Sequence, residues 1–261
     1  MPAVELRRHG STAHLVMNRP EVHNAFDDGL IAELTAAIDE VEHDDSVRAV
    51  VLTGSGGSFS AGADLNWMRG MAAASEADNL ADSLRLAALM RRLQFLAKPT
   101  VARVNGAAFG GGVGLVACCD IAVTVDSARF ALSEVKLGLV PAVISPYVVA
   151  AIGLRQARRL FVTGELIDSA AALSMGLVHE VVPPDQLDAT VERVLGLLTR
   201  GGPVAQREAK RLALAMGGHT PADAERTDAE NAALIARLRV SPEGQHGLSA
   251  FLDKTTPAWV G

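Results

Sequence analysis

The sequence predicts an α/β fold that ends in a helical C-terminal unit. Short apolar runs typical of buried strands alternate with amphipathic helical segments as far as about Pro146, and the pattern beyond is mostly helical. Two glycine-rich loops each follow a buried strand. The 261 residues, 49% of them hydrophobic, are enough for one large domain with a substantial core.

The N-terminal part of the chain predicts two strands and a helix. The strands lie at about Val4–Arg8 and Ala13–Asn18 and are joined by a tight turn. A loop over Arg19–Phe26 leads into the helix, and Asp27 or Asp28 can cap its N-terminus. The helix is predicted by apolar residues at helical spacing, namely Leu30, Leu34, Ala37, Ile38 and Val41.

The middle of the chain continues this alternation. The apolar strand Arg48–Thr53 ends in the small-residue loop GSGGSFSAGAD, and a long helix covers about Glu76–Leu96 until Pro99 ends it. The strand TVARV follows and runs into the loop NGAAFGGGVG. The next segment, LVACCDIAVTV, predicts a short helix and then a strand.

The rest of the chain is predicted to be helical. A hinge at Gly201–Pro203 separates a core of residues 1–200 from a unit of residues 201–261, which has two long helices and a short tail. These Ala-rich helices are too short to bury both faces alone. We therefore expect them to pack on the core or on a neighbouring subunit. The preceding core helices are predicted at Tyr147–Ile152, Arg155–Thr163, Asp168–Met175 and Gln186–Thr199.

Composition excludes several classes of protein. The net charge is −6 and no run of Lys or Arg resembles a nucleic-acid footprint, so we expect no nucleic-acid partner. Cys118 and Cys119 are adjacent in an apolar stretch, which favours free thiols and a cytoplasmic protein. No signal peptide or membrane span of ~20 apolar residues is evident. The histidines lack ligand spacing, so we expect no metal site.

The two glycine-rich loops place backbone N–H groups at helix starts. They cover Ser60–Leu65 and Asn105–Gly114. The N–H groups at a helix start lack intrahelical partners and carry partial positive charge. Two of them aimed at one point would form an oxyanion hole, in which each donor contributes about 3 kcal/mol to the transition state. A glycine run after a strand is, however, more often only a tight turn.

Other glycine-loop sites fail on spacing. The segment Gly54–Phe59 begins as G-x-G but has Phe59 where a dinucleotide-binding loop needs its last glycine. Neither a phosphate-binding G-x-x-x-x-G-K-[ST] nor a G-x-S-x-G nucleophile motif occurs in the sequence.

The motifs together resemble a known family. The succession of FSAGADLNWM, NGAAFGGGVGLVACCDIAV and ARFALSEVKLGLVPA strongly resembles the enoyl-CoA hydratase/isomerase (crotonase) family. RPEVHNAF, FVTGELIDSAAALSMGLVHEVVP and FLDKTTPAW are similar to further family segments, so the likeness covers essentially the whole chain. It implies a ββα-spiral core with a helical oligomerisation unit, a homotrimer or homohexamer (a dimer of trimers), and an acyl-CoA substrate.

The resemblance also implies roles for individual residues. The backbone amides of Ala63 and Gly111 would hold the thioester carbonyl, and Glu134 would transfer protons. No separate cofactor is expected, because coenzyme A is part of the substrate. His23 is a candidate contact to coenzyme A, and the alternative is that its role is structural. The expected contacts to coenzyme A are His23, Ala61, Ala63, Asp64, Leu65 and Lys254, the last in a segment that often comes from a neighbouring subunit.

Gly114 departs from the family's hydratases. A second carboxylate is expected there, so that one group activates water while the other handles the proton at Cα. With Glu134 alone, one group must serve both transfers, or another residue or water must help. The candidate helpers, each with packing or capping as its alternative role, are Ser133, Ser145 and Tyr147.

The segment PAVISP is a second departure. The combination of GGGVGL, SEVKLGL and PAVISP resembles the 3-methylglutaconyl-CoA hydratases of leucine degradation and their isoprenoid-glutaconyl relatives. Such substrates carry a distal carboxylate that needs a cationic partner. The candidates, each also readable as a solvated helix charge, are Arg69, Arg85, Arg91 and Arg92.

The leading hypothesis is a lyase that adds water to a 2-enoyl-CoA, or removes it, through a stabilised enolate. An enoyl-CoA isomerase is the nearest rival, since one carboxylate suits a proton shift between two carbons. A non-catalytic acyl-CoA-binding protein is a further alternative, and a peptidase on the same fold is remote. The pathway would be fatty-acid or leucine metabolism.

Overall fold

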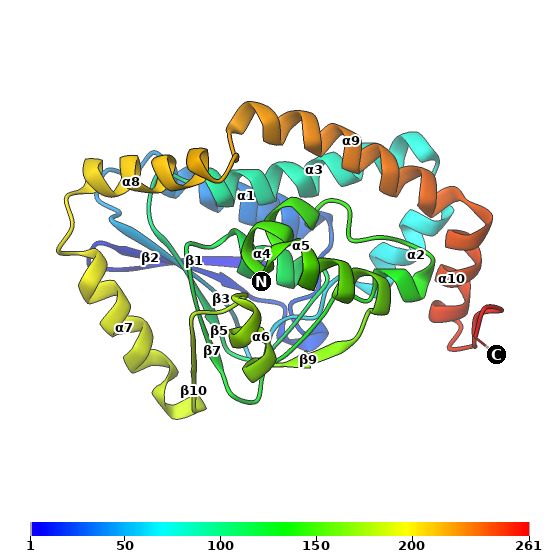
Figure 1. The fold of residues 1–261 in the computed structure, drawn as a ribbon, viewed down its shortest axis with the longest axis horizontal. Helices are drawn as coiled ribbons and strands as arrows, with labels where there is room; N and C mark the ends of the chain where they lie inside the picture. Colours follow the sequence, from blue (N-terminus) through cyan, green and yellow to red (C-terminus); the bar gives the residue numbers. More distant parts are fainter. Residues whose placement is uncertain (1, 261) are drawn as a thin grey trace.

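The computed structural model describes residues 2–260, in which two sheets are covered by helices (Figure 1). The larger sheet has the order β1-β2-β3-β5-β7-β10, with β1 antiparallel to β2 and the other pairs parallel. The central strand β3 is buried along its whole length, as its unbroken apolar run predicts. The bounds are Val4–His9 (β1), Thr12–Met17 (β2), Ala49–Gly54 (β3), Thr100–Val104 (β5), Ile121–Val125 (β7) and Glu180–Val182 (β10).

The smaller sheet has the order β4-β6-β8-β9. The strands β4, β6 and β8 each follow a strand of the larger sheet along the chain. Each turn of the fold therefore contributes one strand to the larger sheet and one to the smaller sheet. This arrangement confirms the predicted α/β fold. These strands were not predicted as separate elements, because each has only three residues. They are Ser58–Ser60 (β4), Ala107–Phe109 (β6), Arg129–Ala131 (β8) and Leu166–Asp168 (β9).

The helices of the core largely follow the prediction. Asp27 caps the first helix, α1, by accepting from the N–H of Leu30 at 2.8 Å. A helix start was expected at the end of the first glycine-rich loop, but no extent was predicted for α2. The two helices expected around Gly153 form one element, α5, with a break at that glycine (φ 75°, ψ 156°). The bounds are Asp28–Glu42 (α1), Leu65–Ala73 (α2), Glu76–Phe95 (α3), Gly111–Cys118 (α4), Ser145–Thr163 (α5), Ser169–Met175 (α6) and Leu187–Leu198 (α7), with 3₁₀ helices at Pro20–Val22, Glu134–Leu137 and Pro184–Gln186.

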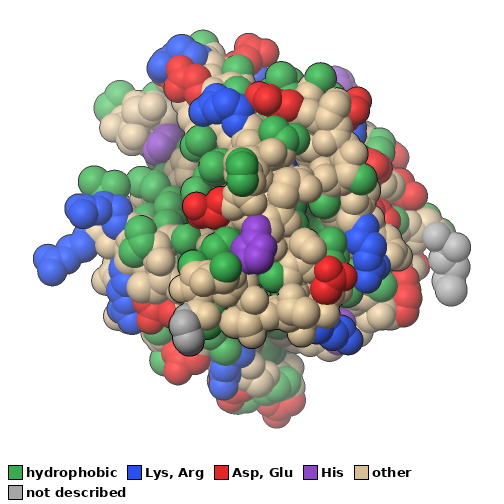
Figure 2. All heavy atoms as spheres, turned by 90° about the vertical axis from the view of Figure 1, so that its right-hand side faces the viewer, with side chains coloured by type: hydrophobic (Ala, Val, Ile, Leu, Met, Phe, Trp, Pro, Cys, Tyr) green, Lys and Arg blue, Asp and Glu red, His purple; other side chains and the backbone are tan. Residues whose placement is uncertain are grey.

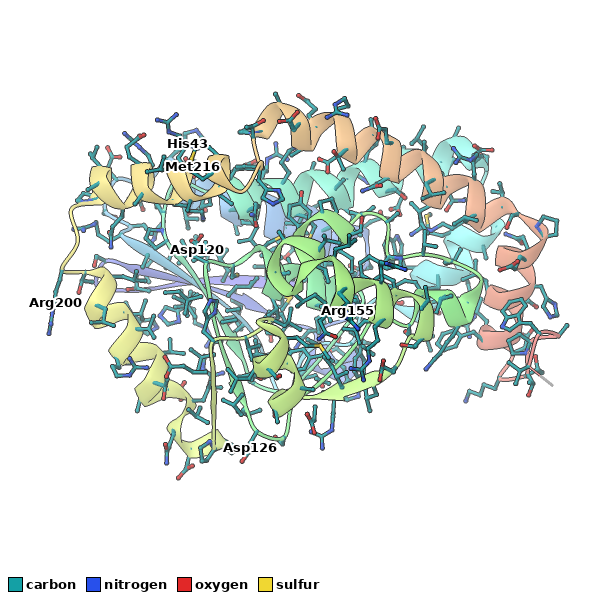
Figure 3. All side chains as sticks on the ribbon, in the orientation of Figure 1. His43, Asp120, Asp126, Arg155, Arg200 and Met216 are labelled. Atoms are coloured by element: carbon teal, nitrogen blue, oxygen red, sulfur yellow. The ribbon has the colours of Figure 1, made fainter. Side chains whose placement is uncertain are left out.

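The C-terminal region forms three helices rather than two: Pro203–Met216 (α8), Pro221–Val240 (α9) and Pro242–Leu252 (α10). α9 lies along α3, and α10 packs on α2 and on the 3₁₀ helix at residues 134–137 (Figure 1). α8 has no buried residue: Leu212 is 61% exposed and Met216, labelled in Figure 3, is 77% exposed. Of the three helices, α9 and α10 pack on the core of their own chain, whereas α8 buries no residue against it.

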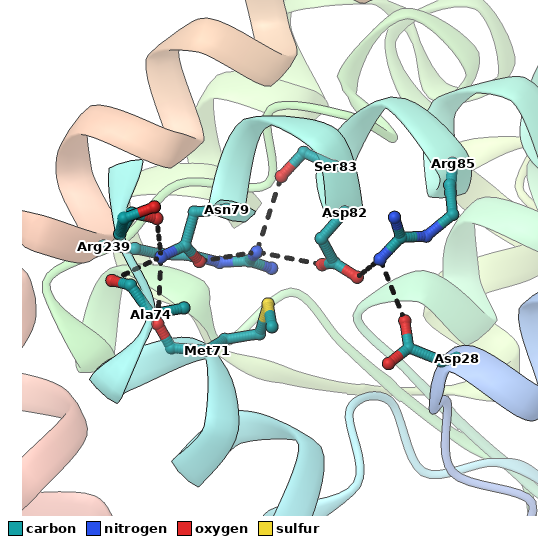
Figure 4. Close-up of polar contacts among 9 residues, drawn as sticks. Asp28, Met71, Ala74, Asn79, Asp82, Ser83, Arg85 and Arg239 are labelled. Carbon is teal, nitrogen blue, oxygen red and sulfur yellow. Dashed lines mark hydrogen bonds and ion pairs between the residues drawn. The ribbon is translucent and has the colours of Figure 1, made fainter. Parts of the chain in front are cut away.

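A buried arginine fastens α9 to the core (Figure 4). The guanidinium of Arg239 donates to Asp82 Oδ2 at 3.1 Å and to Asn79 Oδ1 at 3.2 Å, both on α3. It also lies 5.7 Å from the ring centre of Trp67 on α2. On the other side, Arg85 pairs with Asp82. This network fixes α2, α3 and α9 relative to one another.

Within residues 2–260, no helix is both long and apolar enough to span a bilayer.

Candidate active site

A cleft of about 310 Å³ lies where the two glycine-rich loops meet the C-terminal segment. Residues 61–63 and 109–111 come from the two loops, and residues 133, 134, 136 and 137 come from the strand-to-helix turn around Glu134. Phe251, Thr255 and Pro257 contribute from the C-terminal segment. Figure 2 shows the face that carries this segment, with hydrophobic side chains at the surface and Lys and Arg side chains toward its margin.

The first loop leaves the amide of Ala63 free. The N–H of Phe26 donates to the carbonyl oxygen of Gly62 at 2.6 Å, and the N–H of Asp64 donates to the carbonyl oxygen of Phe26 at 2.8 Å. These bonds flank Ala63, whose own N–H has no acceptor among the described residues. Gly62 has φ 86°, a left-handed conformation that favours glycine.

The second loop leaves the amide of Gly111 free. Gly110 donates its N–H to the carbonyl oxygen of Ala131 at 2.9 Å, and α4 begins at the next residue. The first N–H groups of a helix have no intrahelical acceptor, and the helix start carries partial positive charge. Within the described chain, the N–H of Gly111 has no hydrogen-bond acceptor.

The two loops approach closely. A Cβ atom added to Gly62 would lie 3.2 Å from the carbonyl oxygen of Phe109, and one added to Gly110 would lie 4.0 Å from the Cα of Gly62. Ala63 and Gly111 are the next residues of the two loops, and both line the cleft. Two residues whose amides lack an acceptor therefore line the same cleft, which is a condition for an oxyanion hole.

Glu134 lines the same cleft. A Cβ atom on Gly110 would be 3.1 Å from its Oε1, and its Oε2 is buried without a hydrogen-bond partner in the described structure. Burial raises the pKa of Glu134 from 4.5 to about 7. Because both protonation states are then populated near neutral pH, the carboxyl can accept a proton and return it.

The raised pKa predicts a measurable effect on stability. In the unfolded chain Glu134 ionises near 4.5, so the folded state loses stability as pH rises from there through about 7. We expect Glu134→Gln to remove this loss and to be more stable than wild type above pH 7 by up to roughly 3 kcal/mol. Urea unfolding at pH 5 and pH 8 tests this. Glu230→Gln is the control. The side chain of Glu230 is 67% exposed, so this substitution should not alter the pH dependence of the free energy of unfolding.

Apolar side chains fill the space beside Gly114. A Cβ atom there would lie 2.3 Å from Ile144 Cγ2 and 3.3 Å from Met90 Cε. A larger residue at position 114 would therefore collide with the start of α5. Among the described residues that line the cleft, Glu134 is the one carboxylate.

The other predicted contacts divide into two groups. Ala61 lines the cleft, whereas His23, Asp64, Leu65 and Lys254 are not among its lining residues. Asp64 caps α2 by accepting from the N–H of Asn66 at 2.8 Å, and Leu65 is 49% exposed. His23 is exposed, with its Nδ1 3.1 Å from the hydroxyl of Ser58, which fits its structural alternative. Lys254 is an exposed residue at the turn beside Thr255.

The chain's own C-terminal segment forms part of the cleft, and the contact expected from a neighbouring subunit stays a prediction. The close packing of α10 explains this placement: a Cβ atom on Gly247 would lie 2.3 Å from the carbonyl oxygen of Leu137. Of the candidate helpers, Ser133 lines the cleft. Ser145 donates to Ala142 at the start of α5, and the hydroxyl of Tyr147 is buried without a partner among the described residues, outside the cleft.

None of the four candidate arginines lines the cleft. Each contacts a neighbour elsewhere: Arg69 with Asn66, Arg85 with Asp28 and Asp82, Arg91 with Glu225 and Asp228, and Arg92 with Asp39. The cation that lines the cleft is Lys136, which was not among the predicted cationic partners. The sequence offered one signal for this residue, because Lys136 lies two residues after the predicted catalytic Glu134.

Comparison with known proteins decides the family. A family model described as enoyl-CoA hydratase/isomerase matches residues 7–261. The chain belongs to this enoyl-CoA hydratase/isomerase family. The 2,3-dehydroadipyl-CoA hydratase of Escherichia coli is 35% identical over 251 residues, which are 95% of this chain and 94% of that protein. The trans-2-decenoyl-[acyl-carrier-protein] isomerase of Streptococcus mutans is 30% identical over 254 residues, covering 95% of this chain and 94% of the isomerase.

A solved structure of the same family confirms the fold. The crystal structure of an enoyl-CoA hydratase from Shewanella pealeana is 41% identical, with a TM-score of 0.81 over 98% of this chain and 96% of that chain. The family therefore contains both hydratases and isomerases among the relatives of this chain. The predicted crotonase-type fold is confirmed.

Proposed function

We propose that this chain is an enoyl-CoA hydratase that works with one carboxylate. The observation that carries the proposal is the position of Glu134, whose buried and unpartnered Oε2 lies in the same cleft as two free backbone amides. The hydratase names among its relatives support the same reaction.

The proposed reaction begins with the thioester carbonyl oxygen accepting from the amides of Ala63 and Gly111. Glu134 in its carboxylate form takes a proton from a water molecule as the water oxygen bonds to Cβ. The electron pair of the double bond moves toward the carbonyl and forms an enolate, which the two fixed N–H dipoles stabilise without rearranging. Glu134, now neutral, returns the proton to Cα and is restored as a carboxylate. Because one residue serves both carbons, hydrogen and hydroxyl add to the same face.

An isomerase is the second candidate, and the closed space at Gly114 favours it. Glu134 would remove the Cα proton of a 3-enoyl-CoA and return it at the γ carbon, which needs no second carboxylate. The isomerase name of the Streptococcus mutans relative supports this candidate. A non-catalytic acyl-CoA-binding protein would bind thioesters in the same cleft without converting them.

The finer proposal is a substrate of the 3-methylglutaconyl-CoA type. Its distal carboxylate needs a cation, and Lys136 lines the cleft without an ion-pair partner in the described part of the chain. Lys136→Met should therefore raise KM for 3-methylglutaconyl-CoA more than KM for crotonyl-CoA.

Liquid chromatography coupled to mass spectrometry tests the proposed function, because hydration adds the mass of one water, whereas a shifted double bond changes the retention time and not the mass. Crotonyl-CoA, 3-methylglutaconyl-CoA and a 3-enoyl-CoA are each incubated with the wild type. Gain of one water on a conjugated substrate supports the hydratase. A shifted double bond without gain of water supports the isomerase instead, and tight binding without conversion of any of the three supports a binding protein.

We also propose that the chain assembles as a trimer or a dimer of trimers. The exposed apolar side chains of α8, Val204, Leu212 and Met216, support association, since a helix with no buried residue has a face available for contact. Sedimentation velocity at micromolar concentration should give a species of three or six chains. A monomer at that concentration would contradict this prediction.

A further inference from the structure

One side chain links the two loops that carry the free amides. The backbone of Phe26 pairs with the residues on either side of Ala63, through the bonds to Gly62 and Asp64. The ring of Phe26 abuts the other loop, because a Cβ atom added to Gly111 would lie 3.0 Å from its Cε2. Phe26 is only 2% exposed, so neither end of this link is free to move into solvent.

An arginine holds the segment that carries Phe26. The guanidinium of Arg19 donates to the carbonyl oxygen of Ala25 at 2.6 Å and lies 2.9 Å from Asp27 Oδ2 and 3.0 Å from Asp64 Oδ2. It therefore bridges the residues on both sides of Phe26 to the residue that follows Ala63. The planar fork of arginine suits such a set of acceptors better than the single ammonium of lysine does.

Asp64 connects the first loop to Arg19 and to the start of α2. Its carboxylate is 7% exposed and accepts from the N–H groups of Asn66 and Trp67 at the start of α2. Burial alone would raise the pKa of Asp64, but the hydrogen bonds from these two amides and from Arg19 outweigh it and lower that pKa. Asp64 is thus held as an anion between Arg19 and α2.

We propose that Phe26, held in place by Arg19, is a positioning residue that sets the separation of the Ala63 and Gly111 amides. This inference rests on the proposed function, in which those two amides hold the thioester carbonyl. Phe26 has no polar side-chain atom and transfers no proton, so it acts only through the two loops. Its backbone fixes one amide while the width of its ring fixes the distance to the other.

The expected effect follows from how an oxyanion hole works. Its donors must meet the carbonyl oxygen where charge develops, and a misplacement of about 1 Å can lower a rate by about 100-fold. Replacing the ring of Phe26 by the smaller Leu side chain removes the ring contact at Gly111 and leaves the bond from Gly110 to Ala131 to hold that loop. We expect Phe26→Leu to lower kcat by about 10- to 100-fold with little change in KM, the pattern of an interaction made mainly in the transition state.

The test compares Phe26→Leu with the matched variant Phe130→Leu. Phe130 is 1% exposed and lines a small apolar space with Val148 and Ile152, whose lining includes neither Ala63 nor Gly111. Besides kinetics, each protein is mixed with cinnamoyl-CoA, whose absorption moves to longer wavelength when donors polarise its thioester carbonyl. This spectral shift reports the oxyanion hole directly and needs no turnover. Arg19→Lys is a second variant that keeps the charge and loses the fork.

The proposal predicts a reduced spectral shift and a lower kcat for Phe26→Leu, an intermediate reduction for Arg19→Lys, and wild-type shift for Phe130→Leu. A full spectral shift in Phe26→Leu, or in Arg19→Lys if the first variant does not fold, would overturn it. An equal reduction in Phe130→Leu would also overturn it, because any core defect would then suffice. A wild type that shifts the spectrum but converts no substrate would count against the proposed function alone.

Discussion

Glu134→Gln should lower turnover by about 100- to 10,000-fold, the range typical of losing a general acid–base group. Glutamine keeps the shape of the side chain but cannot take a proton from water or return one to carbon. Binding of a saturated thioester such as butyryl-CoA should stay within a few-fold of wild type, because the two amides and the cleft remain. Steady-state kinetics and calorimetric binding measure the two quantities separately.

The control for this variant is Glu230→Gln, which removes an exposed carboxylate from α9 and should leave both quantities unchanged. Turnover of Glu134→Gln at the wild-type rate would show that another group transfers the protons. Loss of both turnover and binding would show that the substitution disturbs the cleft as a whole.

Gly114→Glu should destabilise the protein and should not create a second working carboxylate. The new side chain would meet Ile144 Cγ2 at 2.3 Å from its first carbon, and its carboxylate would enter an apolar part of the core. Overpacking costs about 1–3 kcal/mol and an unpaired buried charge costs more, so we expect a loss above roughly 3 kcal/mol in the free energy of unfolding. Urea unfolding measures this loss.

Gly196→Glu is the matched control, because no atom lies within 4 Å of the position that its Cβ would take on α7. It should unfold at nearly the wild-type urea concentration. Combining Gly114→Glu with Ile144→Ala should recover part of the lost stability, since the alanine vacates the contested space. A stable Gly114→Glu protein with faster hydration would contradict the single-carboxylate account.

Much of the fold could be predicted because its longer elements have clear periodicity. The apolar run at residues 49–53 and the helical spacing from Leu30 to Val41 each determine a buried face, and the structure confirms both. The strands of the smaller sheet could not be predicted, since three residues are too few to show alternation. The extent of α2 could not be predicted because Asn66, Arg69 and Gly70 interrupt its short apolar pattern.

The candidate site was predictable only in part for a similar reason. Glycine loops and Glu134 are local motifs, and the family resemblance gave them roles that the geometry supports. The contacts that shape the site join residues far apart in sequence, such as Phe26 with Gly111 and Ile144 with Gly114. No local pattern reports such contacts. The absence of a second carboxylate was visible at Gly114, but the side chains that occupy its place were not.

In the proposed mechanism, Glu134 alone transfers protons at both carbons. The most direct test is exchange of the α protons of butyryl-CoA in D₂O, followed by NMR or mass spectrometry for wild type and Glu134→Gln. Butyryl-CoA has no double bond to hydrate, so the exchange isolates the step at Cα. We expect the wild type to incorporate deuterium at Cα and Glu134→Gln to lose this exchange together with hydration. Exchange in Glu134→Gln at the wild-type rate would contradict this mechanism, because a different residue would then serve Cα.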